Sequence, residues 1–240
     1  MDFTYEAYVA MLDRLHNCGY TVVDYHNYED CSKAVILRHD VDMSLEKAVE
    51  LAHIEKDCGV QSTYYILISS EFYNIYSKRS TDCIAEIRAC GHNIGLHFDE
   101  EKYDKSSNIV ECMEKEIDIL ELCLGERVRS ISMHRPSSKT LEANYVIKQG
   151  NVINSYSKEF FLNFKYVSDS RKHWREDILN IIESRRYNRL HILTHPIWYE
   201  KSFKDMSIQL EEFCERAKEE RYLALKDNIK DLEAVFPWRA

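Results

Sequence analysis

The chain has 240 residues, of which 45% are hydrophobic and 12% aromatic, and its formal net charge is −9. This length suits one α/β barrel, and the hydrophobic fraction is sufficient for a sizeable core. The acidic charge balance argues against nonspecific binding to nucleic acid or to an anionic membrane surface. The chain has only 3 prolines and 6 glycines, so we expect neither linkers nor low-complexity segments.

The compartment is predicted from the lack of a recognisable targeting segment and from the spacing of the cysteines. No run of residues is long and apolar enough for a membrane span, and the acidic start MDFTYEAYVAMLDRL lacks the pattern of a signal peptide. None of the 8 cysteines lies in a CxxC pair. Cys83 and Cys90, like Cys112 and Cys123, are spaced to share one helix face, which is typical of core thiols in a reducing compartment. We expect a cytoplasmic protein without stable membrane insertion.

Strands and helices alternate along most of the predicted chain. The N-terminal helix has an apolar stripe that ends at Gly19 as a C-cap. A short strand is expected at 20–25, and seven more at 34–40, 62–69, 93–98, 128–134, 151–157, 165–170 and 189–195. Helices are expected at 44–59, 80–91, 109–124 and 176–184, and a long helix reaches about Phe236.

This alternation predicts right-handed βαβ units and a parallel sheet, as in a barrel or a doubly wound fold. No break in composition divides the chain. We therefore expect a single domain over residues 1–240. Its motif-bearing core lies at about 34–199, with the N- and C-terminal helices packed on it.

Polar side chains, most of them titratable, collect where the predicted strands end. The residues concerned are His39, Asp40, Asp42, His97, Asp99, His134, Arg135, Asp169, Thr194 and His195. The carboxyl ends of parallel strands share one rim, and active sites of α/β proteins are built there. Contact with solvent explains one or two polar strand ends, but their recurrence at five ends favours a shared site.

Carboxylates and imidazoles are the ligands of hydrolytic zinc sites, which keep one position open for water. Asp40 and Asp42 are two residues apart in an extended segment, so both carboxylates can point into one cavity. Without a cation, two close carboxylates repel each other and one pKa rises. A metal beside one of them removes this conflict and leaves the other free to take a proton.

The order of the segments RHDVD, GHNIGLHFD, HRP, SDS and ILTHP resembles the polysaccharide deacetylases, carbohydrate esterase family 4. The resemblance covers about residues 34–199. It implies a distorted seven-stranded (β/α) barrel that removes N- or O-acetyl groups from sugars. The similarity is to a divergent branch associated with surface-polysaccharide biosynthesis.

The same resemblance implies a role for each matching residue. Asp40 corresponds to the general base of the family, and Asp42 corresponds to a metal ligand. His97 matches the second ligand in the GHNIGLH segment. His195 matches the general acid, and Asp169 resembles the aspartate that orients it.

The third metal ligand is where the sequence departs from the family. Val41 separates two aspartates that are usually adjacent, and Glu101 stands where a second histidine is usual. His134 ends the fourth strand, which neighbours the strand of His97 if the strand order is sequential. We therefore favour His134 over Glu101, while Asp99 could join the metal or bind sugar hydroxyls. Zinc is the divalent metal that such N/O ligands favour.

Other residues are candidates for substrate binding. Arg38 and Arg135 could fix Asp40 or bind an anionic part of the substrate. Trp198 and Tyr199 directly follow the last strand and are expected to form a wall of the substrate site.

The sequence thus predicts a metal-dependent deacetylase that acts on an acetylated sugar or glycan precursor. The metal polarises the acyl carbonyl and activates water, Asp40 takes the proton, and His195 protonates the leaving group. Two alternatives stay open: a catalytically silent relative that binds sugar, and a metal hydrolase for another amide or a phosphoester. No nucleic-acid partner is expected, and the sequence specifies no oligomeric state.

Overall fold

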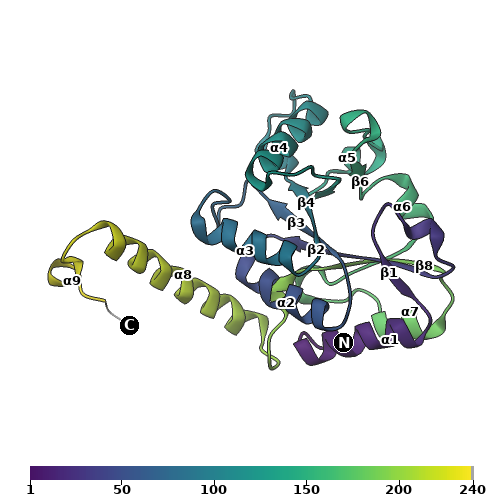
Figure 1. Cartoon of the computed structure of the whole chain (residues 1–240), viewed down its shortest axis with the longest axis horizontal. Coiled ribbons are helices and arrows are strands. Elements are labelled where there is room, and N and C mark those ends of the chain that lie inside the picture. The colour runs from purple at the N-terminus through teal and green to yellow at the C-terminus, as the bar shows by residue number, and fades with distance from the viewer. Residues whose placement is uncertain (239–240) are drawn as a thin grey trace. The chain divides into compact units, whose positions relative to one another are not determined.

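The computed structural model describes residues 1–238 and contains eight strands and nine α-helices within them (Figure 1). The strands are β1 Thr21–Val23, β2 Ala34–Val41, β3 Thr63–Leu67, β4 Asn93–Phe98, β5 Ser130–Met133, β6 Ile153–Asn154, β7 Lys165–Ser168 and β8 Arg189–Thr194. The helices are α1 Tyr5–Asn17, α2 Leu45–Asp57, α3 Lys78–Ala89, α4 Ile109–Leu124, α5 Ser138–Ala143, α6 Lys158–Leu162, α7 Ile178–Ser184, α8 Met206–Asn228 and α9 Leu232–Val235. All seven strands expected from residue 34 onward are confirmed, as is the short strand before them.

The chain divides into two compact units, Met1–Lys201 and Ser202–Ala240. The first unit contains all the strands and α1 to α7, and the second contains α8 and α9. The two units are described separately, so a single domain with the C-terminal helix packed on the core stays a prediction. Within residues 1–238, no helix is both long and apolar enough to cross a membrane.

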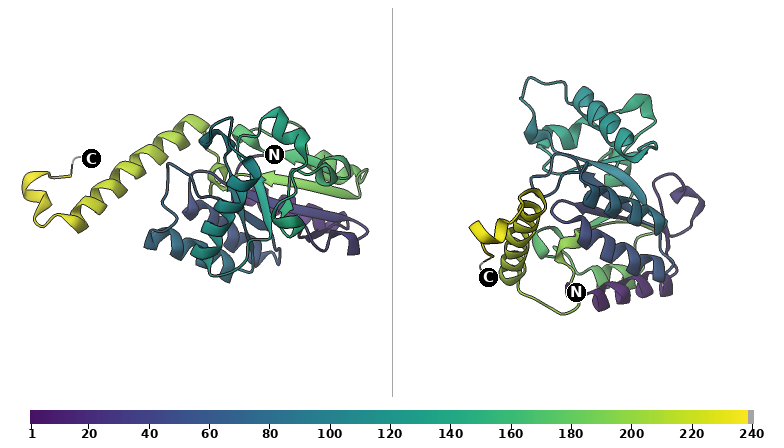
Figure 2. Two further views of the ribbon diagram at one scale, coloured as in Figure 1. Left: turned by 90° about the horizontal axis from the view of Figure 1, so that it is seen from above. Right: turned by 60° about the vertical axis from the view of Figure 1, so that its left-hand side comes forward.

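The predicted C-terminal helix is shorter than expected. Instead of reaching Phe236 it ends at Asn228, because Ile229 is extended (φ −119°, ψ 111°). Asp231 then adopts a left-handed conformation (φ 59°) before α9 begins. The left view of Figure 2 shows α8 as one long helix, drawn in yellow-green.

The sheet is an incomplete barrel. Its strand order is β6-β5-β4-β3-β2-β8-β7, and every ladder in it is parallel. Strands β2 to β8 thus follow one another around a seven-stranded barrel in the order of the chain. The barrel is open between β6 and β7, because no ladder joins these two strands among the described residues. β1 pairs with the first half of β2, and β3 pairs with the second half. The expected α/β fold with a distorted (β/α) barrel is confirmed.

Both faces of β2 are buried, which explains its continuous apolar run. Successive side chains point to opposite faces of a strand. Ala34 and Ile36 therefore join a cluster inside the barrel, whereas Val35 and Leu37 join a cluster with residues of α1 and α7. The same alternation continues into the polar segment. Arg38 and Asp40 face the barrel interior, and His39 faces the helices.

Gly95 in β4 is required by a close approach of Tyr65. These two residues are directly opposite in the β3–β4 ladder. A Cβ atom at position 95 would lie 2.3 Å from Cε1 of the Tyr65 ring. The missing side chain therefore lets the ring lie over β4 while its hydroxyl donates to Ser130 Oγ at 2.9 Å. Gly95 thus serves the packing of the strand that carries His97.

The start of α2 fixes how the chain leaves the rim. Ser44, two residues after Asp42, is the N-cap, and its hydroxyl oxygen accepts from Lys47 N at 3.2 Å. Gly59 follows the helix in a left-handed conformation (φ 68°). Both ends of this helix were predicted from the sequence.

Candidate active site

Three side chains from neighbouring segments meet at the carboxyl ends of the strands. Asp42 follows β2, His97 belongs to β4, and His134 follows β5. Asp42 Oδ1 lies 3.1 Å from both His97 Nε2 and His134 Nδ1, and the two nitrogens are 3.2 Å apart. β4 and β5 are adjacent in the sheet, so the sequential strand order on which His134 was chosen is confirmed.

The three atoms fit the ligands of one metal ion. Zinc bonds to nitrogen and oxygen of about 2.0–2.1 Å at tetrahedral angles place neighbouring ligand atoms about 3.3 Å apart. Asp42 Oδ1 is buried and, among residues 1–238, receives no hydrogen bond of good geometry, although two nitrogens surround it. His97 is fully buried, while the Asp42 and His134 side chains are 20% and 22% exposed, which leaves an open side. The metal roles of these residues stay predictions.

Asp42 is a carboxylate in this arrangement. Burial alone would raise its pKa, but the close approach of the His134 and His97 imidazoles and the charges of His97 and His195 hold the pKa well below its usual range. An ionised oxygen beside two imidazoles is the donor set that a divalent cation favours.

The other two carboxylates considered as third ligands are engaged with Arg135. Its guanidinium forms an ion pair with Asp99 and a second one with Glu101 Oε2 at 2.8 Å. Asp99 also accepts from the Glu101 backbone N–H at 3.2 Å. Burial would raise the pKa of Asp99, but its hydrogen bond to Arg135 lowers it. The expected substrate roles of Asp99 and Arg135 stay predictions; Arg135 directly follows His134 in sequence, and Asp99 is held by its ion pair with Arg135.

Asp40 is held from inside the barrel. Arg38 Nη2 donates to Asp40 Oδ2 at 3.2 Å, and Ser132 Oγ donates to Oδ1 at 3.2 Å. The Arg38 side chain is fully buried and also donates to Ser155 Oγ at 2.6 Å and to the Tyr156 hydroxyl at 3.1 Å. Of the two roles expected for Arg38, the geometry therefore supports fixing Asp40, because a buried guanidinium has no surface to offer a substrate.

Ser132, Ser155 and Tyr156 were not anticipated from the sequence. A signal for the first of them exists in β5, where Ser130 and Ser132 alternate with apolar residues in a fully buried strand. Such a period of two places both hydroxyls on one face of the strand, here the barrel interior. The other two residues follow β6 and carry no comparable pattern.

His195 is oriented by a buried aspartate. Its Nδ1 lies 2.6 Å from Asp169 Oδ1, and its backbone N–H donates to Asp169 Oδ2 at 3.1 Å. Burial would lower the pKa of His195, but the charge of Asp169, its hydrogen bond and the charges of Asp42 and Asp40 raise it to about 9. The ring is therefore an imidazolium at neutral pH, as a general acid must be.

The expected substrate wall after β8 needs one correction. Tyr199 is fully buried, packs with Phe3 and Tyr8, and donates its hydroxyl to Asp169 Oδ2 at 3.1 Å. It supports the aspartate that orients His195 and cannot contact a substrate. Trp198 is half-buried against the same apolar cluster, and its substrate role stays a prediction.

The two groups that can move protons flank the three-residue cluster. Asp40 Oδ2 lies 3.6 Å from His97 Nε2, and His195 Nε2 lies 3.8 Å from Asp42 Oδ2. A carboxylate and an imidazolium thus lie close to the same three-residue cluster, one beside His97 and the other beside Asp42. This arrangement can add water to a polarised carbonyl and protonate the group that leaves.

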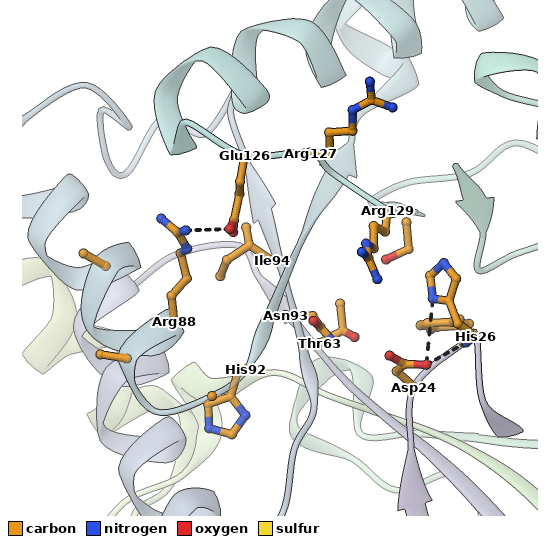
Figure 3. A pocket seen from close by; sticks show the side chains of 15 residues that line it. Asp24, His26, Thr63, Arg88, His92, Asn93, Ile94, Glu126, Arg127 and Arg129 are labelled. Carbon is orange, nitrogen blue, oxygen red and sulfur yellow. Dashed lines mark hydrogen bonds and ion pairs between the residues drawn. The ribbon is translucent and has the colours of Figure 1, made fainter. Parts of the chain in front are cut away.

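A cleft of about 770 Å³ lies elsewhere, at the amino ends of the strands (Figure 3). Its lining includes Thr63, Asn93 and Ser130, the first residues of β3, β4 and β5, together with Arg88 and Arg129. None of the site residues expected from the sequence lines it. The acid, the base and the ligand set all lie at the opposite end of the parallel strands, so we place the candidate active site there.

Comparison with known proteins shows likeness in structure only. No family profile matches the chain, and no curated protein matches it in sequence. A family 4 carbohydrate esterase pseudoenzyme from Bacillus anthracis superposes with a TM-score of 0.48 at 14% identity, over 80% of this chain and 62% of that one. The chain thus spans less than two thirds of that protein's length.

Two further structures have similar scores. A family 4 carbohydrate esterase from Bacillus anthracis has a TM-score of 0.46 at 15% identity, over 87% of this chain and 84% of that one. The polysaccharide deacetylase Bc1974 from Bacillus cereus has a TM-score of 0.48 at 16% identity, over 73% and 93%. The three structures are a family 4 carbohydrate esterase pseudoenzyme, a family 4 carbohydrate esterase and a polysaccharide deacetylase, and the chain is similar to them in fold alone.

Proposed function

We propose that the protein is a metal-dependent deacetylase that hydrolyses an acetyl amide or ester on a sugar or glycan precursor. One observation carries this proposal: a base held by Arg38 and an acid held by Asp169 flank three converging ligand atoms. Asp42, His97 and His134 would hold the ion, for which we propose zinc. When bound, the ion supplies a Lewis acid for the acyl oxygen and for water.

Asp40 is the proton acceptor in this proposal. Its carboxylate faces the cluster, and the contacts with Arg38 and Ser132 leave it little freedom to turn away. A base held in place removes the proton of the attacking water without an orientation cost at the moment of reaction.

His195 is the proton donor. Because Nδ1 is engaged with Asp169, the proton on Nε2 is the one available for transfer. Nε2 points to the cluster side, 3.8 Å from Asp42. It can deliver this proton to the amine or alkoxide that leaves the acyl carbon.

We propose further that the enzyme meets its substrate in the cytoplasm, as a step in surface-polysaccharide biosynthesis. The cysteine pattern supports this, since all eight cysteines are free thiols. The fitting substrates are then acetylated sugars linked to a nucleotide or a lipid carrier.

The test is acetate release by the zinc-loaded protein. Release from an acetylated sugar supports a deacetylase. Bound zinc with hydrolysis of a phosphoester or a non-sugar amide alone would indicate a different metal hydrolase. Zinc-free protein that takes up none on titration, and that releases no acetate, would indicate a silent relative.

A further inference from the structure

Glu55 in α2 is a buried carboxylate that the proposed chemistry does not use. It is fully buried and accepts hydrogen bonds from four side chains. The Tyr8 hydroxyl donates to Oε1 at 2.6 Å, and His39 Nε2 lies 2.9 Å from the same oxygen. The hydroxyls of Ser62 and Tyr64 donate to Oε2 at 2.7 and 2.8 Å. This cluster joins α1, α2, β2 and β3 on the outer side of the sheet.

His39 extends the cluster to the strands that carry the base and the acid. Its Nδ1 lies 2.6 Å from Thr194 Oγ1, and the two residues are opposite each other in the β2–β8 ladder. His39 directly precedes Asp40, and Thr194 directly precedes His195. In the link Glu55–His39–Thr194, His39 is therefore adjacent in sequence to the proposed base, and Thr194 is adjacent to the proposed acid.

The ionised state of Glu55 fixes the orientation of His39 in this link. Burial would raise the pKa of Glu55, but the charge and hydrogen bond of His39, the charge of His92 and the hydrogen bond of Tyr8 lower it to about 2. An ionised carboxylate only accepts, so Nε2 of His39 carries a proton and donates it. With a partner at each ring nitrogen, the imidazole is fixed in one orientation.

The position of the link in the sheet distinguishes it from ordinary packing. The preceding residues on the same outer face, Val35 and Leu37 in β2 and Leu190 and Ile192 in β8, are all buried apolar side chains. The polar contact replaces apolar packing only at the last rung before the active site. Replacement of a buried ionic contact by apolar packing is often neutral or even stabilising, so a gain in stability does not account for the polar link at this rung.

We propose that Glu55, His39 and Thr194 are positioning residues that fix the spacing between Asp40 and His195. The inference rests on the proposed function for its catalytic part. None of the three residues can touch a substrate, because all are fully buried behind the sheet. They act through the backbone of β2 and β8.

The experiment uses three variants of the zinc-loaded full chain. Thr194→Val removes only the hydroxyl that faces His39, and Thr194→Ser keeps it. Tyr8→Phe is the matched control, because it removes another hydrogen bond from the same Glu55 oxygen without touching β8. Acetate release from UDP-N-acetylglucosamine and from N-acetylchitotetraose, melting temperature and zinc affinity are measured for each.

We expect Thr194→Val to lower kcat by about ten- to a hundredfold at unchanged KM and zinc affinity. Thr194→Ser should restore kcat to within about threefold, and Tyr8→Phe should lower the melting temperature with kcat within about twofold of wild type. A wild-type kcat in Thr194→Val, or equal losses of kcat in Thr194→Val and Tyr8→Phe, overturns the inference.

A wild-type protein that releases no acetate refutes the proposed function instead. Amide hydrogen exchange then decides the positioning role. Faster exchange at residues 38–41 and 193–195 in Thr194→Val, but not in Tyr8→Phe, supports a link that holds these two strand ends. Unchanged exchange there overturns it.

Discussion

Asp40 and Asp42 are two residues apart, but they have different neighbours. Asp40 accepts from Arg38 and Ser132, whereas Asp42 Oδ1 faces the imidazole nitrogens of His97 and His134. Asp42→Ala should therefore lose zinc, with an affinity at least about a hundredfold weaker. Asp40→Asn should keep zinc and lose about 10²–10⁴-fold in turnover, because only the proton acceptor is missing.

Elemental analysis after dialysis and acetate release separate these two losses. The opposite pattern, with zinc lost from Asp40→Asn and kept by Asp42→Ala, would mean that the two roles are exchanged. Ser132→Ala removes one hydrogen bond to Asp40 and keeps the one from Arg38, so it serves as the control for a mild change in the position of the base.

The pairing of His195 with Asp169 predicts a pH dependence of the metal-free protein. The pKa of His195 is raised to about 9, so its pairing stabilises the fold fully below the unfolded value of about 6.5. This stabilisation is lost as the pH rises through 9. In Asp169→Asn the largest cause of the raised value is removed, and the NMR titration of His195 should move down by more than one pH unit. An unchanged titration midpoint would show that Asp169 does not hold the imidazolium.

Single residues differ in how far the sequence could predict them. Asp40, Asp42, His97 and His195 stand at strand ends in recognisable motifs, and the structure brings them together. Arg38 contacts Ser155 and Tyr156, which are more than 100 positions away in sequence. These contacts depend on closure of the barrel, which no local pattern encodes. Tyr199 was misplaced because the 3₁₀ turn Pro196–Trp198 directs it into the core instead of toward the rim.

At the scale of elements, burial determines which patterns are readable. β2 is buried on both faces and reads as a continuous apolar run, and the helix caps Ser44 and Gly59 are local signals. These features depend on few residues and were predicted correctly. The end of α8 depends on the extended backbone of Ile229, a conformation that the residue type permits but does not specify.

Gly95 provides a test of how β4 supports the site. Gly95→Ala places a methyl group 2.3 Å from the Tyr65 ring, so the ring or the strand must shift. We expect a loss of about 1–3 kcal/mol in the free energy of unfolding. Denaturant unfolding measures this loss, and it should be smaller when Gly95→Ala is made in a Tyr65→Ala background. Equal losses in both backgrounds would show that the tyrosine contact is not the cause.

At the scale of the whole molecule, the proposed catalytic groups lie within the unit Met1–Lys201. The site is built from the ends of strands that are far apart in sequence, so the sequence could predict that a shared rim exists. It could not predict the break between β6 and β7, because pairing of short strands depends on the curvature of the whole sheet.

The substrate class is a prediction at this scale too. In the cytoplasm, where we propose that the protein acts, nucleotide-linked and lipid-linked sugars are present before they become polymers. We therefore expect faster acetate release from UDP-N-acetylglucosamine or an acetylated lipid-linked sugar than from chitin or peptidoglycan fragments of equal acetyl content. Activity confined to the long polymers would place the enzyme outside the cytoplasm.

The central claim is that Asp42, His97 and His134 hold a metal ion. Zinc titration of the wild-type chain, His134→Ala and Glu101→Ala tests it most directly. The structure pairs Glu101 with Arg135 and places His134 in the ligand triangle. We predict one zinc ion per chain with equal affinity in wild type and Glu101→Ala, and at least about a hundredfold weaker binding in His134→Ala. Wild-type affinity in His134→Ala would contradict the account.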